Sequence, residues 1–270
     1  LKPTSPGQRH QIILSKNLLS KNNSIFKNLI NHFHQKKGRS TNTGHITVRH
    51  LGGGCKKVYR KINFGNFWSK SVVVANFYDP YRTSFISLVF DLIKKKFDFL
   101  IMTEYIFPGT ILSSDFEYNF FDFKLGFRTW VKNIAAGAFI HNLSLTSNSK
   151  SNYIRSAGVK GQIIQKTSNG FKIRLPSGII LTTSNLAVAT IGITSNAKHK
   201  LVVLGKAGKN RLKGRRPSVR GIAMNPIDHP HGGNSNGGRV GSSSPWGKST
   251  RGKPTSKKKI RFYVTFNLEG

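Results

Sequence analysis

Short apolar runs with a period of two begin at about residue 70 and mark the first region able to bury a core. The runs are SVVVANFYD, SFISLVFDL and FDFLIMTEYI, and the polar segments YDPYRTS and IKKK separate them. Val, Ile and Phe at alternating positions are typical of strands with one buried face. The pattern predicts a small antiparallel sheet or barrel over residues 70–125.

A second β pattern lies further along the chain, in GQIIQKTSNGFKIRLPSGIILTT. Its three short apolar stretches are separated by TSNG and PSG, which supply the backbone freedom that hairpin turns need. We therefore expect a meander inside a second small β domain over residues 126–197.

The two ends of the chain have a different composition. Residues 1–69 are rich in Gly, Asn, Ser, His and basic residues, and residues 198–270 are rich in Gly, Pro, Ser and basic residues. Such segments bury too little apolar surface to fold alone. The exception is KNLLSKNNSIFKNLINHF, in which apolar residues from Leu18 to Phe33 recur at helical spacing. We interpret it as a short amphipathic helix that packs on a neighbour, in preference to a presequence.

Charge follows the same division. The chain has 44 Lys and Arg against 9 Asp and Glu, a formal net charge of +35. Seven of the nine acidic residues lie between Asp79 and Asp122, and residues 1–70 contain none. A nearly neutral body with two basic ends favours a polyanionic partner, and nucleic acid is the obvious one. No apolar run approaches the about 18 residues of a membrane span, and the single Cys55 excludes an intramolecular disulfide.

The basic motifs carry the chemistry of phosphate binding. GKAGKNRLKGRRPSVRG, 205–221, has seven cationic side chains and no acidic one. Glycines between the cations let the backbone approach a sugar–phosphate chain closely. HLGGGCKKVYRK, 50–61, likewise combines glycines with four cations and no acidic residue, and it matches no nucleotide-binding glycine loop. Trp246, in SSSPWGK, is a candidate for stacking on a base, with packing on neighbouring protein as the alternative.

The segment RGIAMNPIDHPHGGNSNGGRVG, 220–241, admits three interpretations. A zinc site needs about four ligands, and the stretch offers only Asp228, His229 and His231. A catalytic site with His229 as general base lacks a nucleophile or a second carboxylate. The favoured hypothesis is a loop shaped by Pro and Gly, whose two His side chains donate hydrogen bonds to phosphate or a 2′-OH, with Asp228 orienting one of them.

Several motifs occur in one order along the chain: KPTSPGQRH at 2–10, TVRHLGGGCKKVYR at 47–60, YDPYRTSFISLV at 78–89, RSAG at 155–158 and LGKAGKNRLKGRRPSVRGIAMNPIDHPHGG at 204–233. Together they closely resemble the ribosomal protein L-two family, the second universal protein of the large ribosomal subunit. The resemblance implies an all-β fold, an OB-fold barrel followed by an SH3-like barrel, with long basic non-globular extensions at both ends. It also implies a non-enzymatic constituent of the large subunit, because the peptidyl transfer that it supports is carried out by rRNA.

The resemblance also implies partners. These are large-subunit rRNA, neighbouring ribosomal proteins and small-subunit rRNA across the subunit interface, with no cofactor other than rRNA-associated Mg²⁺. It places His229 near the peptidyl transferase region. The residues expected to bind rRNA are Arg9, His10, Arg49, His50, Gly52, Gly53, Gly54, Lys56, Lys57, Arg60, Arg155, Lys206, Lys209, Arg211, Lys213, Arg215, Arg216, Arg220, Asn225, His229, His231, Trp246 and Lys248.

The sequence departs from the family pattern at Cys55, where members usually have His, and in the Phe-rich segment 91–123. Abundant Phe, Asn, Ile and Lys are expected of an AT-rich organelle gene. We therefore expect a mitochondrial ribosome in the matrix, with a plastid ribosome as the alternative. An architectural protein that compacts DNA is the rival function from another class, and an enzyme is a distant third.

Overall fold

The computed structural model describes residues 2–21, 24–32, 38–64, 70–114, 124–147, 149–167, 170–233, 241–252 and 263–264. These residues form two compact units. Unit 1 comprises residues 1–34, 56–205 and 262–270, and unit 2 comprises residues 35–55 and 206–261. Each end of the chain therefore contributes to both units. The division into four successive segments at 69, 125 and 197 stays a prediction.

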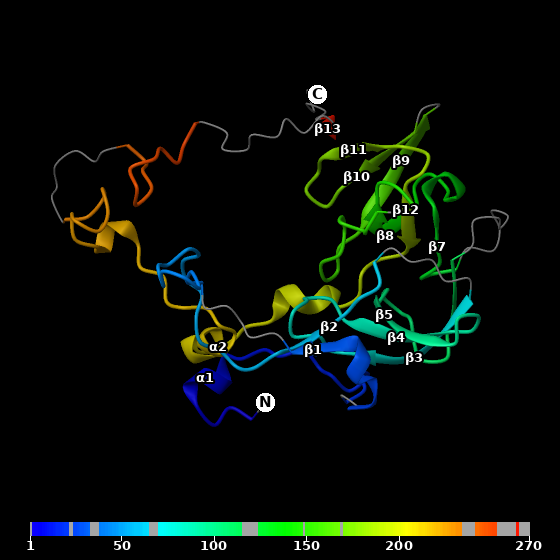
Figure 1. Cartoon of the computed structure of the whole chain (residues 1–270), viewed down its shortest axis with the longest axis horizontal. Helices are drawn as coiled ribbons and strands as arrows, with labels where there is room; N and C mark the ends of the chain where they lie inside the picture. Colours follow the sequence, from blue (N-terminus) through cyan, green and yellow to red (C-terminus); the bar gives the residue numbers. More distant parts are fainter. Residues whose placement is uncertain are drawn as a thin grey trace. The chain divides into compact units, whose positions relative to one another are not determined.

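The first β domain of unit 1 is a four-stranded antiparallel sheet with the order β5-β4-β3-β6, of which Figure 1 labels β3, β4 and β5. Its strands are β3 (Lys70–Phe77), β4 (Ile86–Asp91), β5 (Lys96–Ile101) and β6 (Ile111–Ser113). Side chains of these strands form two buried apolar clusters. One contains Val73, Val89 and Leu100, and the other contains Phe77, Leu88 and Phe99. The period of two in the sequence thus corresponds to a sheet with a buried core.

The second β domain is a seven-stranded antiparallel sheet with the order β13-β11-β10-β9-β8-β12-β7. Its strands are β7 (Arg128–Trp130), β8 (Phe139–Ser144), β9 (Gly161–Thr167), β10 (Gly170–Arg174), β11 (Ile180–Thr183), β12 (Val188–Ile191) and β13 (Tyr263–Val264). The predicted meander is confirmed as β9-β10-β11. At the predicted PSG turn, the Gly178 N–H donates to the Leu175 carbonyl at 3.0 Å. The all-β class, with two successive β domains and basic extensions, is confirmed.

Backbone hydrogen bonds join the two β domains into one body. The Ser195 N–H donates to the Met102 carbonyl at 3.0 Å, and the Glu104 N–H donates to the Ile193 carbonyl at 2.8 Å. An isolated antiparallel bridge pairs Thr103 with Thr194 between these bonds. The loop after β5 is therefore held against the loop after β12.

The amphipathic helix predicted from Leu18 to Phe33 is wrong. Leu18 is 79% exposed, and the described part of the segment contains only the 3-10 helix η1 (Ser24–Leu29), which is kinked at Phe26, followed by β1 (Ile30–His32). Tertiary contacts override the helical spacing. Phe26 and Leu29 pack on the core of the first β domain, and β1 pairs with β2 (Val58–Arg60). Asn and Ser are also poor helix formers because their side chains compete for backbone hydrogen bonds.

The other helical elements are short. They are α1 (Pro6–Arg9), η2 (Val131–Asn133), η3 (Ala197–Leu201), α2 (Ala207–Leu212) and η4 (Gly221–Ala223). Within the described ranges, no helix is long and apolar enough to cross a membrane.

Candidate nucleic-acid interface

A cleft of about 450 Å³ opens on unit 1 and combines aromatic rings with guanidinium groups. We call it the arginine–tyrosine cleft and define it by Tyr59, Phe64, Tyr81, Arg82 and Arg155. The Tyr59 and Tyr81 rings meet edge to face with centroids 5.4 Å apart. The Arg82 guanidinium carbon lies 5.1 Å from the Tyr59 ring centroid, and that of Arg155 lies 4.9 Å from the Phe64 ring centroid. Flat rings and cationic forks together suit a base and its phosphate.

Asp79 organises one wall of this cleft. Its carboxylate is fully buried and forms a close ion pair with Arg82, while the nearest distance to Arg60 Nη1 is 3.8 Å. The same carboxylate accepts the Tyr81 N–H at 2.9 Å. One acidic group thus fixes the backbone of Tyr81 and the guanidinium of Arg82. Two cations share this single negative charge, so the wall stays net positive.

Arg60 lies next to the Asp79 carboxylate, outside the cleft lining, and only 2% of it is exposed. Burial lowers the pKa of its guanidinium, and the Asp79 carboxylate acts in the opposite direction. This residue is therefore placed as a support for the cleft in unit 1. Its predicted role as a phosphate contact stays a prediction.

Hydrogen bonds that involve both β domains fix the positions of the residues on the two sides of the cleft. The Thr83 carbonyl accepts the Asn196 side-chain amide at 2.6 Å, and the Ala157 N–H donates to Thr83 Oγ1 at 3.1 Å. Phe64 is anchored through its carbonyl, which accepts the Ser151 hydroxyl at 2.9 Å and Arg128 Nη2 at 3.4 Å. Residues far apart in the sequence thus set the distance between Arg82 and Arg155.

In unit 2, two basic segments from opposite ends of the chain lie side by side. We call residues 49–55 and 211–216 the basic strand pair, although they form only one isolated bridge and residues 211–212 belong to the end of helix α2. The Gly52 N–H donates to the Gly214 carbonyl and the Cys55 N–H donates to the Leu212 carbonyl, both at 2.9 Å. A Cβ added at Gly54, where φ is +100°, would lie 2.8 Å from the Gly214 nitrogen. The glycine triplet therefore permits a close backbone approach within the protein as well as any approach to RNA.

The basic strand pair brings many of the predicted residues together. Arg49, His50, Gly53, Gly54, Arg211, Lys213, Arg215 and Arg216 are exposed, Gly52 is half-buried, and Arg215 pairs with Leu51 through an isolated bridge. Lys209, in the preceding turn of α2, is half-buried. Lys206, Arg220, Asn225 and Lys248 are also exposed in unit 2. In unit 1, Arg9, His10, Lys56 and Arg155 are exposed, and Lys57 is half-buried with its Nζ 6.0 Å from the Tyr81 ring centroid.

Residues 225–233 form a compact turn, which we call the histidine loop. His229 is only 8% exposed, and its Nδ1 accepts the His231 N–H at 3.0 Å. A Cβ added at Gly221 would lie 2.6 Å from the His229 ring, so only glycine leaves room for it. The Asp228 and His229 N–H groups both donate to the Asn225 carbonyl. His229 is therefore a packed centre of this loop.

The predicted orientation of a histidine by Asp228 is not found, since no hydrogen bond in the described part of the chain links its carboxylate to either ring. His231 Nε2 instead accepts the Ser243 N–H at 3.2 Å. This contact ties the loop to the segment that carries Trp246. No cluster of three His, Cys, Asp or Glu side chains that could hold a metal ion occurs among the described residues.

Trp246 is 72% exposed, and the Arg49 guanidinium carbon lies 5.8 Å from its ring centroid. A cation near one face of an exposed indole stabilises it while leaving ring surface accessible. The pair joins residues from the two basic extensions within unit 2. Trp68 lies outside the described residues.

The sequence analysis did not identify Asp79, Tyr81 and Arg82 as residues of the arginine–tyrosine cleft. The signal was present in YDPYRTS, because Asp and Arg three residues apart around a Pro can share one turn. Their importance depends on Tyr59, Phe64 and Arg155, which are distant in sequence.

Family profiles match most of the chain. The family described as Ribosomal Proteins L2, RNA binding N-terminal domain, matches residues 26–114, and Ribosomal Proteins L2, C-terminal domain, matches residues 124–256. The chain belongs to the ribosomal protein L2 family.

Curated relatives align with nearly the whole of this L2-family chain. The Large ribosomal subunit protein uL2m of Reclinomonas americana is 40% identical over 265 residues, which cover 96% of this chain and 93% of that protein. The uL2 protein of Hyphomonas neptunium is 39% identical over 264 residues, with 96% and 93% covered. That of Buchnera aphidicola subsp. Cinara cedri is 40% identical over 272 residues, with 97% and 96% covered.

Proposed function

We propose that this L2-family chain is a structural, non-enzymatic constituent of the large ribosomal subunit and binds large-subunit rRNA. Unit 2 supplies phosphate contacts along the basic strand pair, and unit 1 supplies the arginine–tyrosine cleft. The protein supports assembly of the peptidyl transferase region and subunit association, while rRNA carries out peptidyl transfer. Its further partners are neighbouring ribosomal proteins and small-subunit rRNA, together with rRNA-associated Mg²⁺.

The observation that carries this proposal is the pairing of residues 49–55 with residues 211–216. Backbone hydrogen bonds place Arg49 and the glycine triplet beside four cations from the opposite end of the chain, Arg211, Lys213, Arg215 and Arg216, although these like charges repel each other. A polyanion on the exposed side chains relieves this repulsion and releases its counterions. RNA offers such a polyanion, together with unpaired bases for exposed rings such as Trp246.

The salt dependence of RNA binding tests the proposal. The double variant Arg215→Gln/Arg216→Gln removes two exposed charges from the basic strand pair. Affinity of the full chain for large-subunit rRNA is measured between 50 and 200 mM salt. Each lost phosphate contact lowers the steepness of log K against log salt by about 0.7–0.9, so the double variant is expected to lower it by about 1.5.

Lys95→Gln/Lys96→Gln is the matched control, because it removes the same charge from the exposed β4–β5 hairpin of unit 1. It should leave the steepness nearly unchanged. Equal reductions in the two double variants would show that net charge alone determines binding, and the proposed interface would be rejected.

We place the protein in the mitochondrial ribosome. The support is the composition expected of an AT-rich organelle gene and the mitochondrial name of the Reclinomonas americana relative. Mass spectrometry of large subunits purified separately from mitochondria and plastids of the source cell tests this. Peptides of the chain in the plastid particle alone would contradict the assignment.

The histidine loop is proposed to lie near the peptidyl transferase region. His229→Ala removes the acceptor of the His231 N–H and leaves space beside Gly221, so the loop should lose its shape. Particles with this variant should mature or form peptide bonds more slowly, while circular dichroism of the full chain keeps its β signal. Normal elongation by fully assembled variant particles would refute the role.

A further inference from the structure

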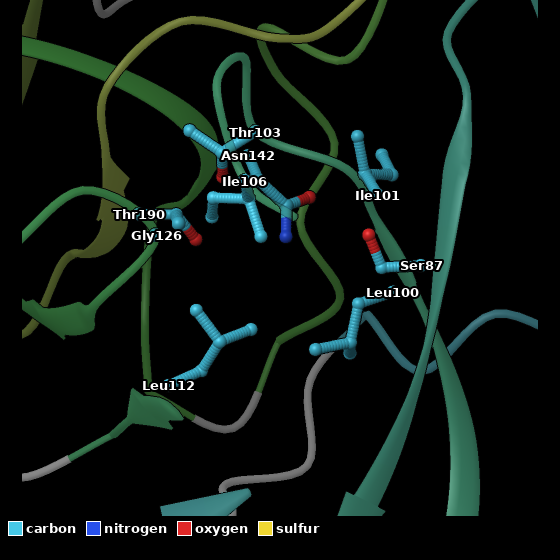
Figure 2. Close-up of a pocket in the computed structure, with 9 residues that line it drawn as sticks. All are labelled: Ser87, Leu100, Ile101, Thr103, Ile106, Leu112, Gly126, Asn142 and Thr190. Atoms are coloured by element: carbon cyan, nitrogen blue, oxygen red, sulfur yellow. The ribbon is translucent and has the colours of Figure 1, made fainter. Parts of the chain in front are cut away.

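A small internal cavity lies between the two β domains of unit 1 (Figure 2). The space open to the centre of a water-sized sphere is about 10 Å³. All nine lining residues are buried, and they come from both β domains. Five of them are apolar or glycine, and the four polar ones are Ser87, Thr103, Asn142 and Thr190. A volume of this size holds about one water molecule and nothing larger.

Asn142 projects its amide into this cavity, as Figure 2 shows. The residue is only 7% exposed, and its Oδ1 has no hydrogen-bond partner among the described residues. Its backbone is fully used, since the N–H donates to the Ile154 carbonyl at 2.9 Å and its own carbonyl accepts Arg128 Nη1 at 3.0 Å. A buried carbonyl oxygen without a donor is strongly unfavourable. The cavity therefore calls for a hydrogen-bond donor.

Ser87, from the first β domain, adds a second acceptor to the cavity lining. Its hydroxyl proton is given to Asn76 Oδ1 at 2.7 Å, so only the lone pairs of Ser87 Oγ remain for the cavity. A ligand that contacts both side-chain oxygens must therefore donate to each of them. Water has two O–H donors on one atom, so a single water can donate to both oxygens. The cavity lining also includes the hydroxyl of Thr103, which lies 3.1 Å from His141 Nε2.

The oxygen-rich wall would also suit a monovalent cation, but the local charge disfavours one. The buried guanidinium of Arg128 lies 3.4 Å from Thr190 Oγ1 at the edge of the same cavity. Like charges separated by only a few ångströms in a poorly solvated site repel strongly. A neutral donor is consistent with this field.

We propose that the cavity is a specific binding site for one structural water, which donates to Asn142 of β8 and to Ser87 of β4. The water links the second β domain to the first, beside the direct backbone bonds at Ser195 and Glu104. It makes the junction behind the arginine–tyrosine cleft part of one polar network. The inference concerns the interior of unit 1 and does not depend on the proposed function.

A crystal structure of the full chain at about 2 Å or better tests the proposal. The expected result is a density peak within hydrogen-bonding distance of both Asn142 Oδ1 and Ser87 Oγ. In Asn142→Gly, which tolerates the φ of +51° at this position, the peak should be lost. Lys95→Gly is the matched control, since it replaces an exposed residue with a φ of +49° and should keep the peak.

Solution measurements cover the case in which a variant fails to fold. Oxygen-17 relaxation dispersion of the wild-type full chain counts long-lived internal waters, and Leu100→Phe, which fills the cavity from the β5 side, should lower that count by one. Absence of a peak in a wild-type map that shows other buried waters would overturn the proposal. A peak with the short contacts and anomalous signal of a metal cation would overturn it as well.

Discussion

Acidification from pH 7.5 to pH 5 should destabilise unit 1 through His141. This side chain is fully buried between the two β domains, with its Nε2 3.1 Å from Thr103 Oγ1. Burial lowers its pKa to about 4, the nearby backbone of Gly192 acts in the opposite direction, and the charge of Arg128 adds to the decrease. An exposed histidine in the unfolded chain has a pKa of about 6.5.

The direction of the change in stability with pH follows from the pKa of His141 in the folded and unfolded states. Above pH 6.5 the ring is neutral in both states, and His141 adds no pH dependence. Between pH 6.5 and pH 4 the unfolded chain binds the proton and the folded protein does not, so stability falls as the pH falls. The integrated effect is about 3 kcal/mol, of which about 2 kcal/mol is reached by pH 5.

The assay is urea denaturation of the full chain at fixed ionic strength, at several values of pH between 7.5 and 5. His141→Asn removes the titrating ring, so the difference between its curve and the wild-type curve isolates this one group. His45→Asn, at an exposed position in unit 2, is the control and should follow the wild type. Parallel pH curves for the wild type and His141→Asn would refute the role of His141.

Three further changes address the cleft, the core and the basic strand pair. Tyr81→Ala should weaken rRNA binding about 5- to 150-fold, the value of about 1–3 kcal/mol for one stacked base, whereas Phe107→Ala, at an exposed aromatic of the same domain, should retain affinity in filter binding. Arg128→Met leaves several buried acceptors without a donor and should cost about 3 kcal/mol or more in urea denaturation; a loss below about 1 kcal/mol would contradict this. Gly54→Ala should disrupt the backbone pairing, seen as lost amide-exchange protection at Gly52, and Gly44→Ala, which also has positive φ but open space, should not.

The β elements were predictable because their signal is local. Alternating apolar residues and the PSG turn predict β9, β10 and β11 without knowledge of any partner. The helix predicted around Leu18 failed for the complementary reason. Its apolar residues have helical spacing, but Phe26 packs on the first β domain. The residues that follow form β1 and make backbone hydrogen bonds with β2 in place of a helix. Isolated short helices are only marginally stable, so such contacts decide the outcome.

The candidate site divides in the same way. Net charge, its concentration at the two ends and the glycines between the cations could be seen in the sequence, because each depends on composition and spacing alone. Two features of the site could be seen only in the tertiary structure. The burial of Arg60 behind Asp79 depends on β2 lying against the YDPYRTS turn, and the cleft depends on Arg155 of one β domain facing Arg82 of the other.

The two basic extensions show the division most clearly. Each has a composition that predicts too little buried apolar surface to fold alone. In unit 2 they pair, because Gly54 and Gly214 carry no side chains that would keep the two backbones apart. Local residue preferences thus determined which segments are strands and which are basic and irregular. Contacts between residues more than a hundred positions apart decided which cations share a surface, since packing and hydrogen bonding act on distance in space.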